Sequence, residues 1–133
     1  MTRVLVDTSA LVAFLDADDP RHAEVVATFE ELAFDDLVTH GYVIAESLAV
    51  TRRRLGVEAT ISLLDDVLPA IELLPVDTLH AHAQQRYRSS LPSGTSFVDQ
   101  VSLAVIEREG ITTALVLDTD FAASGVRMIP APG

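Results

Sequence analysis

The sequence contains no cysteine and no lysine, so all nine of its basic residues are arginine. The lack of cysteine excludes disulfide bonds, thiolate nucleophiles and metal centres that depend on cysteine ligands. The lack of lysine excludes a Walker A loop, Schiff-base catalysis and the receiver-domain type of phosphoacceptor site, which uses a lysine. A chain without cysteine also fits a reducing compartment, and we expect a cytoplasmic location.

Long hydrophobic runs are absent as well. No stretch approaches the roughly 18 apolar residues that a membrane-spanning helix needs. Arg3 precedes a short apolar run, but Asp7 interrupts that run, so no signal peptide is recognisable and we expect no membrane association. With 133 residues, of which 49% are hydrophobic, the chain can bury one good core, and we expect a single domain over residues 1–133.

The formal net charge is −11 at pH 7. Such acidity argues against a protein that coats nucleic acid, because proteins of that kind are normally basic. It does not exclude an enzyme that meets nucleic acid at a metal-filled site. It also suits a basic partner protein.

Short apolar segments alternate with segments of helical periodicity along the chain. We expect strands at residues 3–6, 37–39, 71–76, 113–117 and 126–129, and helices at residues 8–15, 22–32, 42–55, 57–68, 77–88 and 97–109. The first strand has no polar face, as expected for a strand covered on both sides, whereas Pro75 places the 71–76 strand at the periphery. This alternation predicts an α/β sandwich with a largely parallel sheet.

Two aspartates directly follow the strands that we expect at the centre of the sheet. Asp7 ends the first strand and Asp118 ends the 113–117 strand. Functional groups of parallel sheets gather outside the carboxyl ends of the central strands, so these two carboxylates are expected to face each other. Each also has a simpler explanation, because Asp7 precedes Thr8 and Ser9 and suits a helix cap, and Asp118 suits a turn.

Two further acids lie in expected helices. Asp99 closes a capping-box pattern that begins at Ser96, and a carboxylate in the first turn of a helix is also favoured by the helix dipole. Glu46 is the one charged residue in the nearly apolar segment 42–50. A buried carboxylate is costly unless it is paired or coordinates a metal, so Glu46 is the hardest of the four acids to explain structurally.

Several carboxylates that converge without any lysine require a cation. Ligands that are all oxygen indicate a hard ion such as magnesium or manganese, with calcium in a non-catalytic role as an alternative. Zinc is disfavoured because His80 and His82, two residues apart on an expected helix, cannot share a face. We expect these histidines, like His22 and His40, to lie at the surface.

Four segments of the chain together resemble PIN domains, and within that family they resemble the VapC-type toxins of bacterial toxin–antitoxin pairs. The segments are VLVDTSAL at residues 4–11, VIAE at 43–46, SFVD at 96–99 and LDTDF at 117–121. Each motif alone is weak. Four acids at matching places, in the right order and over nearly the whole chain, are more specific.

The resemblance implies a three-layer α/β sandwich with a mostly parallel five-stranded sheet flanked by helices. It also implies a magnesium- or manganese-dependent endoribonuclease that leaves a 5′-phosphate and a 3′-hydroxyl, a homodimer, and neutralisation by a cognate antitoxin. By this resemblance Asp7, Glu46, Asp99 and Asp118 match the acidic positions that hold the metal and act in catalysis.

Three neighbouring residues also correspond to family positions. Thr8 and Ser9 match the polar pair that follows the first acid and orients ligands or bound water. Many relatives with a similar Ser-Phe-x-Asp segment carry histidine where this chain has Asp120. Whether Asp120 is itself a metal ligand or supports the ligands is left open.

An arginine cluster ends the expected helix that carries Glu46. Arg53 lies seven residues after Glu46, two turns along the same face, so we expect Arg53, together with Arg52, to bind an RNA phosphate beside the metal. The alternative is that these arginines stabilise the helix C-terminus, as cations do.

Three other functions compete with a ribonuclease. The segment 117–120 after an apolar strand is similar to the nucleophile motif of haloacid-dehalogenase-like phosphatases, but that motif normally begins its fold and requires a later lysine. A catalytically silent PIN-like binding module is a second alternative, against which the retention of four acids argues. A glycosidase-type carboxylate pair is the third, and metal dependence would exclude its usual form.

Overall fold

The structure, a computed structural model, describes residues 3–32 and 36–132, apart from the side chains of residues 120 and 123. Within these residues five strands form one sheet in the order β3-β2-β1-β4-β5, and every neighbouring pair is parallel. The strands are β1 (Val4–Val6), β2 (Leu37–His40), β3 (Glu72–Leu74), β4 (Thr113–Leu115) and β5 (Arg127–Ile129). The expected parallel sheet is therefore confirmed, with β1 at its centre and β3 at an edge, as Pro75 predicted.

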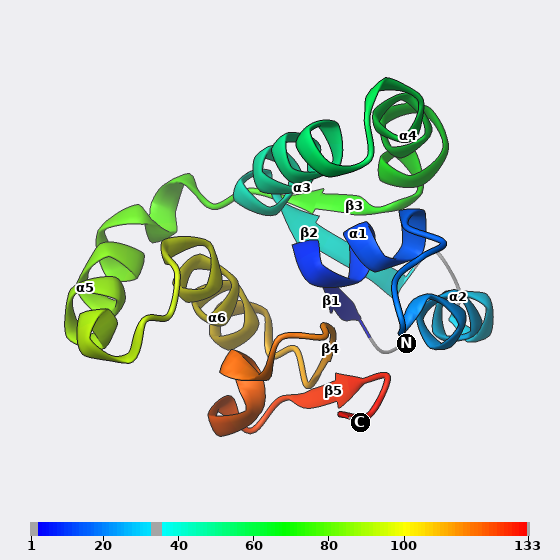
Figure 1. The fold of residues 1–133 in the computed structure, drawn as a ribbon. Coiled ribbons are helices and arrows are strands. Elements are labelled where there is room, and N and C mark those ends of the chain that lie inside the picture. Colours follow the sequence, from blue (N-terminus) through cyan, green and yellow to red (C-terminus); the bar gives the residue numbers. More distant parts are fainter. Residues whose placement is uncertain (1–2, 33–35, 133) are drawn as a thin grey trace.

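Helices cover both faces of the sheet, and Figure 1 shows α1 and α2 on one side and α5 and α6 on the other. The α-helices are α1 (Thr8–Leu15), α2 (His22–Glu31), α3 (Gly41–Arg54), α4 (Val57–Ser62), α5 (His80–Ser90) and α6 (Phe97–Glu109). None of the described helices is both long enough and apolar enough to cross a membrane.

The two faces of β1 enter two separate cores. Val4 and Val6 pack with residues of α1 to α3, whereas Leu5 packs with residues of α6. Successive side chains of a strand point to opposite faces, so a strand that is apolar at every position must be covered on both. The run without a polar face thus produces the middle layer of a three-layer sandwich, as expected.

Cap residues fix both ends of α6. The Ser96 hydroxyl accepts a hydrogen bond from the Asp99 N–H at 3.1 Å, so the predicted cap is confirmed. At the other end Gly110 adopts φ 65°, a left-handed conformation that a residue with a Cβ rarely tolerates. Asp99 is consequently held in the first turn of a helix whose start is well defined.

Three expected element boundaries are wrong. Helix α4 ends at Ser62 and continues as a π-helix (Leu63–Val67) and a 3-10 turn (Leu68–Ala70), where Pro69 has no N–H to extend a helix. The Asp77 side chain caps nothing, because residues 77–79 form a 3-10 turn before α5. Strand β4 stops at Leu115, since the Leu117 N–H donates to the Ser9 hydroxyl instead.

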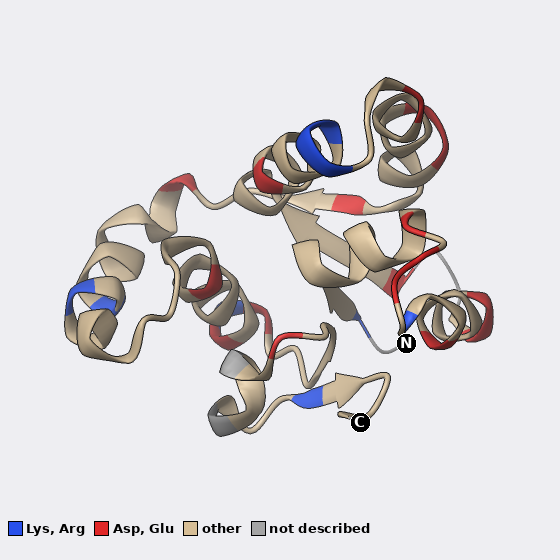
Figure 2. Ribbon diagram, in the orientation of Figure 1, with Lys and Arg blue, Asp and Glu red and all other residues tan. Residues whose placement is uncertain are grey.

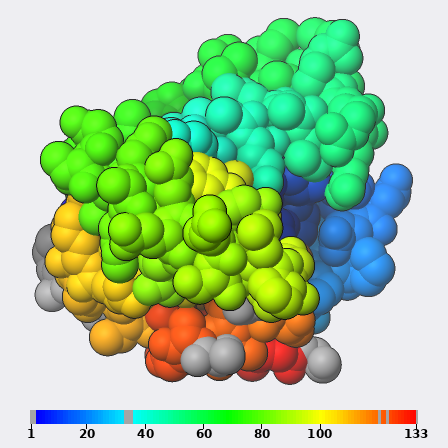
Figure 3. Space-filling view, turned by 90° about the vertical axis from the view of Figure 1, so that its left-hand side faces the viewer, coloured from blue at the N-terminus to red at the C-terminus, as the bar shows by residue number. Residues whose placement is uncertain are grey.

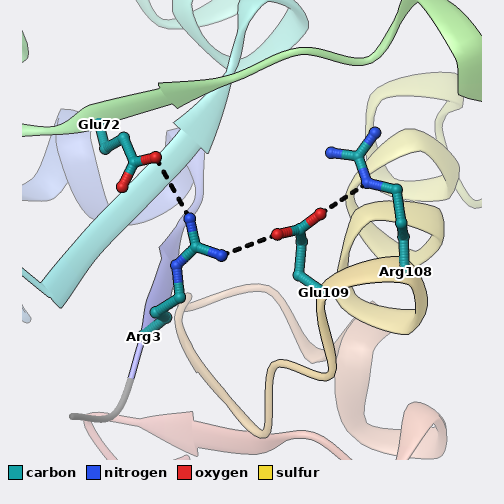
Figure 4. A network of polar contacts seen from close by, with 4 residues as sticks. All are labelled: Arg3, Glu72, Arg108 and Glu109. Atoms are coloured by element: carbon teal, nitrogen blue, oxygen red, sulfur yellow. Dashed lines mark hydrogen bonds and ion pairs between the residues drawn. The ribbon is translucent and has the colours of Figure 1, made fainter.

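An ion-pair network lies at the amino ends of the strands (Figure 4). The Arg3 guanidinium donates to Glu109 at 2.7 Å and to Glu72 at 3.2 Å, and Arg108 donates to Glu109 at 2.7 Å. These contacts join the start of β1 to β3 and to the end of α6. The hydrogen bonds from Arg108 and Arg3 hold the pKa of the Glu109 carboxyl below its ordinary value. The opposite edge, at the carboxyl ends of the strands, carries the acids considered below.

Candidate active site

A cavity of about 610 Å³ opens at the carboxyl edge of the sheet. In Figure 3 the dark blue N-terminal segment lies at the back of a hollow, bordered by the green end of α3, the yellow-green segment before α6 and the blue segment after α1. Six residues singled out in the sequence line this cavity: Asp7, Thr8, Ser9, Glu46, Asp99 and Asp118. The fold therefore brings together side chains that are as many as 111 positions apart in the chain.

The two carboxylate oxygens of Asp7 have different surroundings. Oδ2 accepts hydrogen bonds from the Ser9 N–H at 3.2 Å and from the Ser9 hydroxyl at 2.8 Å, so Asp7 does cap α1. Oδ1 is buried and has no hydrogen-bond partner among the described residues. Capping therefore accounts for one oxygen only, and the other remains available to a ligand.

The environment of Asp7 disfavours its negative charge. Burial raises the pKa of the Asp7 carboxyl, the bonds from Ser9 lower it, and the nearby charges of Glu46 and Asp118 raise it further. The side chain is only 4% exposed, so water offers little compensation. A cation at Oδ1 would give this oxygen a partner and would provide a positive charge that offsets those of the carboxylates.

Thr8 and Ser9 connect the segments that carry the acids. The Ser9 hydroxyl accepts from the Leu117 N–H at 3.0 Å, which ties the start of α1 to the residue before Asp118. The buried Thr8 hydroxyl accepts from the Ser47 hydroxyl at 3.3 Å, beside Glu46 on α3. These bonds connect the segments that carry Asp7, Glu46 and Asp118. That Thr8 and Ser9 also orient ligands or bound water stays a prediction.

The other three acids reach the cavity from different elements. Glu46 is half-buried on α3, Asp99 is 6% exposed in the first turn of α6, and Asp118 is half-buried after β4. Among the described residues no three Asp, Glu or His side chains are gathered closely enough to hold a metal ion as they lie. A metal would therefore have to draw these carboxylates toward Asp7, and their role as ligands stays a prediction.

The arginine that lines the cavity is Arg54, while Arg52 and Arg53 are exposed on the same turn of α3 and are not part of the described lining. Arg53, which lies seven residues after Glu46, is predicted to bind RNA from its place on the helix, but the described lining does not include it. Residues spaced four apart form rows that wind obliquely around a helix, and the cavity follows the row of Glu46, Val50 and Arg54. The spacing of four residues was the signal that could have identified Arg54.

The sequence profile of the PIN domain family matches residues 4–125 of this chain. The chain belongs to the PIN domain family. This PIN domain is 28% identical over 132 residues to the 23S rRNA-specific endonuclease VapC20 of Mycobacterium tuberculosis, a match that covers 92% of this chain and 94% of that protein. It is 39% identical to Ribonuclease VapC26 of the same organism over 64 residues, which are 48% of this chain and 47% of VapC26.

Solved structures give the same assignment. The crystal structure of Mycobacterium tuberculosis VapC20, described as a sarcin–ricin loop cleaving toxin, superimposes with a TM-score of 0.83 at 26% identity and covers 92% of this chain and 95% of that one. FitAcB from Neisseria gonorrhoeae superimposes with a TM-score of 0.72 at 22% identity, covering 94% and 95% of the two chains. The second likeness extends to the fold alone.

A further prediction for this PIN domain concerns an acid beyond these four. The side chain of Asp120 lies outside the described residues, so its part in a metal site stays a prediction.

His40 was expected at the surface, and that expectation is wrong, because its side chain is fully buried. The continuous strand β2 carries His40 beneath α6, where its Nε2 lies 2.8 Å from the Ser102 hydroxyl, and burial lowers its pKa to about 4. His80 and His82 are exposed, as expected.

Proposed function

We propose that this PIN domain is a metal-dependent endoribonuclease that hydrolyses RNA phosphodiester bonds and acts as the toxin of a toxin–antitoxin pair. The observation that carries the proposal is a cavity lined by four carboxylates, with one buried oxygen of Asp7 left without a partner among the described residues. The relatives support it, since they are named as a ribonuclease, a 23S rRNA-specific endonuclease and a sarcin–ricin loop cleaving toxin.

The residues that would hold the metal are Asp7, Glu46, Asp99 and Asp118, with Asp120 as a further predicted ligand. A donor set made only of carboxylate oxygens fits magnesium or manganese. Such an ion, when bound, lowers the pKa of water and offsets negative charge on the phosphate during in-line displacement. No histidine is required as a base, and the buried His40 contacts Ser102 rather than the cavity.

The residues of the chain itself position this site. Ser9 holds Oδ2 of Asp7 with two hydrogen bonds, which fixes the carboxylate so that Oδ1 is the oxygen offered to the ion. The Asp7 N–H donates to the Leu115 carbonyl at 3.0 Å and thus keeps Asp7 at a constant distance from β4. Ser96 sets the first turn of α6 and with it the backbone position of Asp99. Short connections of this kind preorganise a site.

Partners follow from the charge and from the relatives. A protein with a formal net charge of −11 suits a basic antitoxin segment that reaches the acidic cavity. The name of VapC20 as a toxin supports an antitoxin of this kind. A homodimer in the cytoplasm is the assembly that we propose on the basis of the family resemblance.

The test is cleavage of a labelled RNA by the purified protein, freed of any antitoxin, with manganese and then with excess EDTA. We expect cleavage with the metal and its loss in EDTA. Cleavage that continues undiminished in EDTA would refute the metal-dependent mechanism.

A catalytically silent binding module is the second candidate. It is favoured by the observation that no three acidic side chains of the described residues are yet gathered around one point. Titration with manganese separates the two, since a silent module that has lost its metal site releases no binding heat. The ribonuclease should bind manganese and lose this binding in Asp99→Asn.

A further inference from the structure

We propose that Arg54 binds an RNA phosphate other than the scissile one and thereby recruits the substrate into the acidic cavity. This inference rests on the proposed ribonuclease function and names a substrate-binding residue for it. Arg54 is the last residue of α3 and lines the cavity together with Glu46 and Val50 of the same helix.

The cavity has a strongly one-sided charge. Its described lining contains five acidic side chains, namely those of the four site acids and of Asp19, and a single basic one, that of Arg54. In Figure 2 the last turn of α3 is blue, while the segment that follows α1 is red. An RNA strand carries a negative charge at every phosphate, so an acidic cavity repels it wherever no cation intervenes. Arg54 is the lining residue that can reverse this repulsion.

The Arg54 guanidinium is available for such a contact. Among the described residues Arg3, Arg21, Arg86 and Arg108 are engaged in ion pairs with glutamates, whereas Arg54 forms no hydrogen bond or ion pair with any described residue. Arg54 needs no carboxylate partner at this position, because the negative end of the α3 dipole favours a cation in the last turn of the helix. The planar fork of a guanidinium also matches the oxygens of a phosphate.

The spacing along α3 indicates which phosphate is bound. Arg54 lies eight positions after Glu46, and a rise of 1.5 Å per residue places their backbones about 12 Å apart. This separation of two helical turns places Arg54 away from the acid of α3 that would hold the metal. It suits a phosphate farther along the strand, so Arg54 acts in binding rather than in the chemical step.

The chain offers two matched controls. Arg52 and Arg53 belong to the same helical turn and are exposed, but the described lining does not include them. Replacing any of the three by glutamine removes one positive charge from the same end of α3. A general electrostatic effect must therefore appear in all three variants, and a phosphate contact in the cavity must appear in Arg54→Gln alone.

The experiment measures kcat and KM for a labelled single-stranded RNA with manganese, for the wild type, Arg52→Gln, Arg53→Gln, Arg54→Gln and Arg54→Lys. We expect Arg54→Gln to raise KM about tenfold with kcat nearly unchanged, as for the loss of one charge-assisted contact. Arg54→Lys should recover much of the loss, and Arg52→Gln and Arg53→Gln, which remove the same charge outside the described lining, should each raise KM less than Arg54→Gln does. Equal losses in all three glutamine variants, or a fall in kcat at unchanged KM, would overturn the proposal.

A binding measurement separates this proposal from the proposed function. Fluorescence anisotropy of the same RNA with Asp99→Asn protein, with and without Arg54→Gln, should show weaker binding and a salt slope that is smaller by about 1 for the double variant. If the wild type binds RNA through Arg54 but never cuts it, the activity is wrong and the phosphate site stands. If the wild type cuts RNA and Arg54→Gln behaves like its controls, the phosphate site is wrong and the activity stands.

Discussion

Asp7 combines a structural contact and an unsatisfied one in a single side chain. Its Oδ2 is held by Ser9, whereas its Oδ1 is buried without a hydrogen-bond partner among the described residues. Such an oxygen costs free energy in the folded state, because dehydration is not compensated. A site built for a cation tolerates this cost, since binding of the ion to the native state offsets it.

Replacing Asp7 by asparagine should therefore increase stability and abolish cleavage. Asparagine keeps the cap of α1 and removes a charge that burial disfavours, so we expect the metal-free variant to gain roughly 0.5–2 kcal/mol. Melting curves with and without manganese check this. The wild type should be stabilised by the metal and Asp7→Asn should not, and an equal shift in both proteins would show that Asp7 is not at the metal site.

The buried His40 should make the folding stability of the protein depend on pH below neutrality. Its pKa is lowered to about 4 in the folded state from an ordinary value of 6.5, so the unfolded chain takes up the proton first as the pH falls. Stability is consequently lost between about pH 6.5 and pH 4, at up to about 1.4 kcal/mol per pH unit. Urea unfolding at pH 7 and pH 5 should show a smaller loss for His40→Gln than for the wild type. An equal loss in the two proteins would contradict this role of His40.

Among the elements, α6 links folding most directly to the site, because its cap also positions an acid. Ser96→Ala removes the acceptor of the Asp99 N–H and should cost about 1 kcal/mol of stability. It should also slow cleavage, since the first turn that carries Asp99 becomes free to fray. Ser96→Thr keeps the hydroxyl and is expected to retain both properties. Urea unfolding and cleavage rates of the two variants check this, and full activity of Ser96→Ala would show that the cap does not position Asp99.

The elements also show what a sequence can and cannot predict. The starts of α1 and α6 follow from Asp7 and Ser96, whose side chains cap their own helices, and the end of α6 follows from Gly110. These signals are local, so they can be read without the fold. The sequence does not predict the π-helix after α4, because no local signal marks it. Its residues Leu63 and Val67 instead pack into the core.

The site was predictable to the extent that it depends on topology. Aspartates after two parallel strands must meet at one edge of the sheet, and Asp7 and Asp118 do so. The place of Arg54 in the cavity depends on which residues of α3 face it, and the burial of His40 depends on α6, which covers the end of β2. Neither the cavity nor this packing can be predicted from the periodicity of a single segment.

On the scale of the whole molecule, the amino and carboxyl edges of the sheet carry different groups of charged residues. At the amino edge Arg3 joins β1 to Glu72 and Glu109, while the carboxyl edge collects acids around a cavity. Together with the formal net charge of −11, this cavity should attract a basic antitoxin. We expect the measured affinity for the antitoxin to fall as salt rises from low to physiological ionic strength. An affinity that salt leaves unchanged would count against electrostatic capture.

The acids of the cavity are proposed to hold a metal ion for RNA hydrolysis. The most direct test is the rate of RNA cleavage as a function of manganese concentration for the wild type, Glu46→Gln, Asp99→Asn and Asp77→Asn. Asp77 is an exposed acid outside the described cavity lining and serves as the matched control. We expect Asp77→Asn to follow the wild type, and the two cavity variants to lose activity strongly, with losses that do not add when they are combined. Wild-type rates in Glu46→Gln and Asp99→Asn at saturating manganese would show that these two acids do not hold a catalytic metal.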